Sequence, residues 1–209
     1  MSIKIRSTFS FLVALAVACT STGSVTAATL SSFPGAITSG SAPYSAGTLV
    51  GTIEFAVFTE AVFESNFSGF DVPSGELAYA YQVLNGAGDF VSSNTVIGLN
   101  SSVTGIGDFT VDNPVAEVSP VSATLAGGSA SWSFAGQGNN IPANGLSSGL
   151  VITSTNLPNP TPTQVDIIVN GGGSAFTFVI GPGDVPIPEP TTLALSCLTF
   201  AFCGFRRSR

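Results

Sequence analysis

The sequence predicts an all-β protein, in which an antiparallel β-sandwich of about nine or ten strands lies between two apolar terminal helices. Short runs rich in Val, Ile, Phe and Tyr alternate with polar residues at a period of two. Gly, Ser, Thr, Asn and Pro interrupt these runs every eight to twelve residues or so, and no long segment has a 3.6-residue period. We therefore expect two packed antiparallel sheets.

The predicted strands are marked by apolar residues two positions apart, which share one face of a sheet. In chain order these sets are Ile53, Phe55 and Val57; Leu77, Tyr79, Tyr81 and Val83; Val121, Ala123 and Leu125; Ala130, Trp132 and Phe134; Leu150 and Ile152; Val165, Ile167 and Val169; and Phe176, Phe178 and Ile180. Turns are predicted at residues 73–76, 85–86, 144–145 and 171–173. The proline-rich stretch 156–163 is expected to cross between the sheets.

Residues 1–28 are typical of a secretory signal peptide. Its parts are a charged start at Lys4 and Arg6, an apolar run over 9–20, and a cleavage site of small residues at Ala27 and Ala28. We expect export through the Sec translocon and removal by signal peptidase. Cys19 suggests lipoprotein processing as an alternative, but the residue three places before it is not the usual Leu.

The C-terminal segment, residues 184–209, has three parts in a fixed order. Pro188, Glu189 and Pro190 form a rigid motif, residues 191–205 are apolar, and Arg206, Arg207 and Arg209 form a basic end over 206–209. A helix over 191–205 is a short membrane span, and flanking arginines stay on the cytoplasmic side. The predicted domain between the two ends, residues 29–183, would then lie outside, joined to the span by a proline-rich stalk at 184–190.

This segment resembles the PEP-CTERM sorting signal, in which a V-P-x-P-E-P motif precedes Ser or Thr, an apolar helix and an arginine-rich end. The matching residues run from Val185 through Pro190 to Thr191, followed by Arg206 and Arg207. The resemblance implies recognition by exosortase, a membrane transpeptidase-like cysteine enzyme that removes the tail and passes the protein to the surface of a bacterial cell. Residues 47–49, 57–58 and 75–83 are weakly similar to the β-rich extracellular domains that precede such tails.

All five basic residues and all three cysteines lie in the two terminal segments. From residue 28 to 187 the chain has eleven acidic residues and no Lys, Arg, His or Cys. Such a body cannot neutralise phosphates, which excludes nucleic-acid binding. It also lacks most general bases, nucleophiles and transition-metal ligands, so we predict a non-enzymatic protein with no catalytic residue.

Oxygen ligands for calcium are the remaining metal chemistry. Gly-x-Gly-Asp occurs at 86–89, 105–108 and 181–184, but without the tandem spacing of calcium-binding repeats, so we interpret these as turns. Two further loop groups, Asp108, Asp112 and Glu117, and Asp71 and Glu76, are expected to be solvated surface acids. We therefore predict no metal site and no cofactor, with calcium as the one alternative.

Two other groups of residues have a possible functional role and a structural one. Glu54, Glu60 and Glu64 cluster in sequence and could supply a glycosidase acid pair, but nothing fixes two of them at the required separation. Trp132, Tyr44, Tyr79 and Tyr81 could stack on sugars, but most of them are in phase with aliphatic residues, which favours core packing.

Together these observations predict an exported surface protein that passes through an inner-membrane intermediate. Its expected partners are the export machinery, exosortase, the membrane before processing, and the polysaccharide of an extracellular biofilm layer. Its predicted role is structural, or interaction within that exopolysaccharide matrix. The alternative is a carbohydrate- or calcium-binding β-sandwich module.

Overall fold

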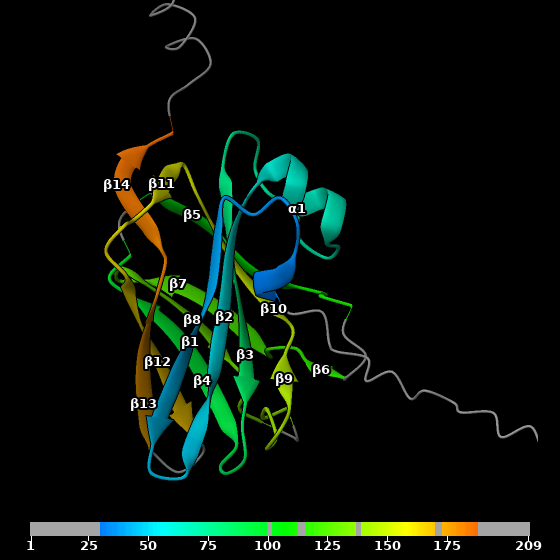
Figure 1. The fold of residues 1–209 in the computed structure, drawn as a ribbon, viewed down its shortest axis with the longest axis vertical. Coiled ribbons are helices and arrows are strands. Elements are labelled where there is room, and N and C mark those ends of the chain that lie inside the picture. Colours follow the sequence, from blue (N-terminus) through cyan, green and yellow to red (C-terminus); the bar gives the residue numbers. More distant parts are fainter. Residues whose placement is uncertain (1–29, 100–101, 113–115, 137–138, 170–172, 188–209) are drawn as a thin grey trace, which may run out of the picture.

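The computed structural model describes residues 30–99, 102–112, 116–136, 139–169 and 173–187 (Figure 1). These residues form fourteen strands, one short α-helix and one 3-10 helix, which confirms the predicted all-β fold and raises the expected strand number. Both predicted terminal helices, at 1–28 and 191–205, lie outside the described residues. Within the described part, no helix is long and apolar enough to cross a membrane.

The larger sheet has seven strands, and all its pairs are antiparallel except β6 with β9. Its main path runs β1 (Thr38–Ala46), β2 (Leu49–Thr59), β3 (Leu77–Asn85), β10 (Gly149–Ser154) and β5 (Val103–Phe109), with β9 (Leu146–Ser147) beside β3 and β6 (Glu117–Val118) beside β9.

The smaller sheet has five antiparallel strands. In spatial order these are β13 (Ser174–Val179), β12 (Thr163–Val169), β4 (Val91–Ile97), β8 (Ser129–Ser133) and β7 (Ser122–Ala126). A separate pair joins β11 (Asn156–Pro158) to β14 (Pro182–Pro186). Because β10 belongs to the larger sheet and β12 to the smaller, the stretch 156–163 crosses between sheets as predicted.

The main core lies between the two sheets. Tyr81 of β3 and Trp132 of β8 come from opposite sheets, and their ring centroids are 6.4 Å apart. Most of the predicted inner-face residues join this cluster, including Ile53, Val57, Leu77, Tyr79, Val83, Ala130, Phe134, Leu150, Ile152, Val165 and Ile167. The period-two pattern therefore identified the inner face of most strands correctly.

A second core covers the outer face of the larger sheet. The 3-10 helix η1 (Leu30–Ser32) and helix α1 (Glu60–Asn66) pack there through buried Leu30 and Phe63. Their partners include Ala78 and Ala80, which alternate with the inner-face tyrosines of β3. As a result β3 is buried on both faces, which a simple alternation of apolar and polar residues does not anticipate.

Two predicted apolar faces are exposed rather than buried. Phe176 and Phe178 of β13 are exposed, whereas Ala175 and Val179 are buried in the main core. In β7, Ala123 and Leu125 lie opposite the buried Trp132 and Ala130, on the predicted side, but all five residues of the strand are exposed. Both β13 and β7 are edge strands, where less of each face is covered by the opposing sheet.

The Gly-x-Gly-Asp stretches are turns in only one case. Residues 86–89 lie in the connection between β3 and β4, whereas 105–108 lie within β5 and 182–184 lie within β14. Inside β5, a Cβ on Gly107 would lie 2.5 Å from a ring carbon of Phe70. The glycine is required there because the Phe70 ring packs directly on the strand.

The predicted stalk begins inside the fold. Strand β14 crosses residue 184 and pairs with β11, and Ile187 N–H donates to Thr155 O at 2.7 Å. Ile187 also packs against the main core. The chain is therefore held against the body up to the residue before Pro188.

Candidate functional site

Several predicted site residues lie outside the described residues: Ala27, Ala28, Pro188, Glu189, Pro190, Arg206, Arg207 and Arg209. The sorting motif and both processing sites therefore remain predictions from the sequence. The structure does describe Ile187, the residue before Pro188, and the surface on which it lies.

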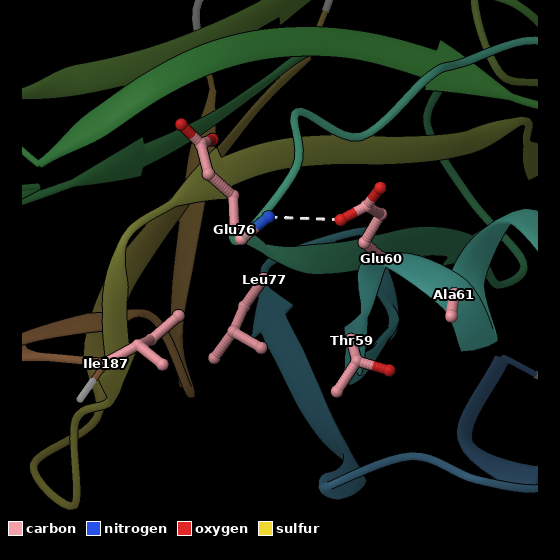
Figure 2. A pocket seen from close by; sticks show the side chains of 7 residues that line it. Thr59, Glu60, Ala61, Glu76, Leu77 and Ile187 are labelled. Atoms are coloured by element: carbon pink, nitrogen blue, oxygen red, sulfur yellow. Dashed lines mark hydrogen bonds between the residues drawn. The ribbon is translucent and has the colours of Figure 1, made fainter. Parts of the chain in front are cut away.

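That surface is a pocket of about 270 Å³. It is lined by Thr59, Glu60, Ala61, Gly75, Glu76, Leu77 and Ile187 (Figure 2). In Figure 1, α1 and the β11–β14 pair lie at the same end of the molecule, which brings the start of α1 close to the end of β14. The pocket thus joins three segments that are far apart in the sequence.

Both carboxylates of the pocket accept hydrogen bonds from other residues of the chain. Glu60 Oε2 accepts the Gly75 N–H at 3.0 Å, as the dashed line in Figure 2 shows. Glu76 accepts the hydroxyl of Thr104, and its own N–H donates to Pro73 O at 3.1 Å, which confirms the predicted turn at 73–76. The pocket therefore presents apolar surface beside two carboxylates that fix a turn.

The remaining glutamates of the predicted acid cluster also accept backbone N–H groups. Glu54, only 6 % exposed, accepts from Ser31 at 3.2 Å, and Glu64 accepts from Val72 at 3.2 Å. Together with Glu60, each of these glutamates binds a different segment. Charge-assisted hydrogen bonds of this kind fix the segments that cover the outer face of the larger sheet.

The loop acids considered for calcium are dispersed among separate partners. Asp108 accepts from Ser148 Oγ at 3.4 Å, and Glu117 accepts from Gln82 Nε2 at 3.4 Å and from Val111 N–H at 3.3 Å. Among the described residues, no three His, Cys, Asp or Glu side chains lie together in an arrangement that could hold a metal ion.

The core interpretation is confirmed for Tyr79, Tyr81 and Trp132, which are buried, and Tyr44 is buried as well. Trp132 Nε1 donates to Gly107 O at 2.7 Å, Tyr79 donates to Asn156 O at 2.7 Å, and Tyr81 donates to Ile180 O at 3.1 Å. Burial raises the pKa of Tyr44, Tyr79 and Tyr81 well above the ordinary value, and in Tyr81 the nearby Tyr79 adds to this effect. None of these rings is available to a ligand.

The exposed aromatic surface lies elsewhere, on the outer face of the smaller sheet. Phe176 and Phe178 are 63 % and 52 % exposed, and their ring centroids are 6.1 Å apart. Asp166 of β12 lies directly opposite Phe176, and Gln164 lies opposite Phe178. Gln164 Nε2 donates to Asp166 Oδ1 at 2.7 Å. We call these four residues the β12–β13 patch.

Comparison of the chain with protein-family models, curated proteins and solved structures finds no match. The function must therefore be argued from the residues and the geometry alone.

The β12–β13 patch does not stand out in the sequence because β13 carries apolar residues on both faces. Ala175 and Val179 form one set and Phe176 and Phe178 form the other, and side-chain size alone favours burial of the phenylalanines. The signal that distinguishes them is the short polar pair on β12, since Gln164 and Asp166 must face away from the core and their cross-strand partners face the same way.

Proposed function

We propose that this chain is an exported bacterial surface protein, sorted by its C-terminal segment and processed there by exosortase. The body then serves as a structural or interaction component of an exopolysaccharide layer. The observation that carries this proposal is the sequence order of a Pro-Glu-Pro motif, an apolar run and an arginine-rich end, together with a signal peptide at the other terminus. The terminal segments also contain every basic residue and every cysteine of the chain.

The fold is consistent with this role. A β-sandwich-type body with two apolar cores needs no disulfide to remain folded outside the cell. Strand β14 contains Val185 and Pro186 and pairs with β11, so the start of the proposed V-P-x-P-E-P motif is held on the folded body. The body would then sit close to the membrane until the tail is removed.

The sorting step is tested by changing the motif while leaving the body intact. We expect replacement of Pro188 and Pro190 by alanine to retain the protein in the membrane fraction, because the extended motif would be lost. A matched control, Asp184→Asn, changes a charge on β14 outside the motif and should leave surface delivery unchanged. Equal delivery of all three proteins to the surface would contradict the proposal.

A second candidate function, carbohydrate binding, is favoured by one specific observation. The β12–β13 patch places two exposed aromatic rings beside a carboxylate and an amide. Polymer binding by the body would be one form of the interaction role proposed above.

A further inference from the structure

The exposed rings of the β12–β13 patch are exceptional on their sheet. The described side chains around them on the outer face are short and polar, such as Ser93, Thr95 and Ser131. Phe176 and Phe178 contact one another at a near-perpendicular interplanar angle of 83°. Adjacent exposed aromatic rings on a polar surface are typical of a binding site.

The polar half of the patch is fixed in place. The hydrogen bond from Gln164 to Asp166 uses only one carboxylate oxygen. A carboxylate offers about four acceptor positions, and an amide offers both donors and acceptors. The pair can therefore bind hydroxyl groups held next to the rings.

The patch continues as a row across the whole smaller sheet. Strand pairing places Phe176, Asp166, Thr95, Ser131 and Thr124 in directly opposite positions, one residue on each of β13, β12, β4, β8 and β7. Thr95 and Ser131 share a hydrogen bond of 3.0 Å between their hydroxyl oxygens. At the usual spacing of neighbouring strands this row is about 19 Å long. Its length suits a polymer of several units better than a single small molecule.

Charge decides which polymer fits. Asp166 is the sole charged residue on the strands of the smaller sheet, and the body carries eleven acidic residues and no basic ones. An anionic polymer would be repelled by this field, and a basic protein would be drawn to the other ten acids, which lie off this sheet. An uncharged polymer rich in hydroxyl groups is compatible with both the row and its charge.

We propose that the β12–β13 patch and the row from Phe176 to Thr124 bind an uncharged polysaccharide lying across the strands. The apolar C–H face of a sugar ring packs on Phe176 or Phe178, and its hydroxyls bind Asp166, Gln164 and the Ser and Thr hydroxyls. This inference deepens the proposed function, since it names the ligand of the body within the polymer layer.

The test uses the protein recovered from the exporting cells, mixed with insoluble cellulose, chitin or amylose as neutral probes and with cross-linked alginate as an anionic one. We expect depletion from solution by at least one neutral polymer and none by alginate. Joint replacement of Phe176 and Phe178 by alanine should weaken binding at least tenfold, and Asp166→Ala several-fold. Phe90→Ala removes another exposed ring, 54 % exposed and outside the patch, and should bind normally.

Retention on none of the neutral polymers, or equal binding by the double variant, would overturn the inference. So would a wild-type dimer that the double variant converts to a monomer without affecting polymer binding, because the patch would then be an interface between copies. Circular dichroism of each variant checks that it is folded. The mass of the C-terminus in the same preparation separates the two proposals: a processed protein that binds no polymer contradicts only this inference, whereas an intact tail contradicts the sorting proposal.

Discussion

Asn94 is fully buried in the main core, and neither polar atom of its side chain has a hydrogen-bond partner among the described residues. It lies opposite Trp132 on β8 and Ile167 on β12. An unpaired buried amide costs about 1–3 kcal/mol of stability. We therefore expect Asn94→Val to raise the free energy of unfolding by about 1–2 kcal/mol in urea denaturation.

Asn94→Ala serves as the control for that substitution, because it removes the amide without adding volume. If both variants lower the free energy of unfolding by more than about 1 kcal/mol, the amide is paired in the folded protein, for instance with buried water.

The buried side chains of Tyr44, Tyr79 and Tyr81 should make the stability of the protein depend on pH in the alkaline range. Burial raises the pKa of each phenol in the folded state above the value of about 10 expected in the unfolded chain. Above pH 10 the unfolded chain therefore holds fewer protons than the folded one. The stabilising contribution of the three tyrosines is therefore complete below pH 10. As the pH rises from 10 toward the folded-state pKa values, the free energy of unfolding falls by about 4 kcal/mol per pH unit for three tyrosines.

Ultraviolet absorbance of the phenolate measures this directly. Because the body has no Lys or Cys, its tyrosines are the groups that titrate in this range. We expect phenolate to appear together with the loss of circular dichroism in one transition. Phenolate formation at pH 10 in a protein that stays folded would contradict the burial of these rings.

At the scale of single elements, β5 depends on glycine for its packing. A Cβ at Gly107 would overlap the Phe70 ring, which itself lies in edge contact with Phe63. We expect Gly107→Ala to lower the free energy of unfolding by about 1–3 kcal/mol through overpacking. In a Phe70→Ala background the same substitution should be neutral or stabilising, because the space is free and alanine restricts the unfolded chain. An equal loss in both backgrounds, measured by denaturation, would rule out this contact as the cause.

Helix α1 is too short to be stable alone, so it depends on the packing of its one buried side chain, Phe63. Phe63 is fully buried and contacts the rings of Phe58, Phe67 and Phe109. We expect Phe63→Ala to lower the free energy of unfolding by about 3–5 kcal/mol. Hydrogen exchange should speed up most in residues 60–66 and less in β8, whose Trp132 belongs to the other core. Equal acceleration in both regions would show that the two cores unfold as one unit.

How much of each element the sequence predicts depends on how many of its faces are buried. The inner faces of β3, β8 and β10 were predicted correctly, because their aromatic and aliphatic residues recur at a period of two. Helix α1 was missed because seven residues are too few to show a helical period. Glycines at 105–108 were interpreted as a turn because glycine is a turn residue by propensity, and the ring that occupies their free space is distant in sequence.

At the scale of the whole molecule, charge is distributed unevenly. Ten of the eleven acidic residues between 28 and 187 lie off the smaller sheet. The total charge was evident from the sequence, but its distribution depends on which strands share a sheet, and pairings such as β4 with β12 are set by contacts distant in sequence. The row from Phe176 to Thr124 was unpredictable for the same reason, since it exists only once β4 pairs with both β12 and β8.

The central claim is that both ends of the chain are removed and that an anionic body, free of thiols, reaches the surface. The intact mass of the exported protein, from cells with and without exosortase, tests this most directly. We predict a mature chain that begins near Ala28 and lacks the apolar run 191–205 and the arginines when exosortase is present, and that keeps them when it is absent. The same mass in both strains, with residues 191–209 still attached, would contradict the account.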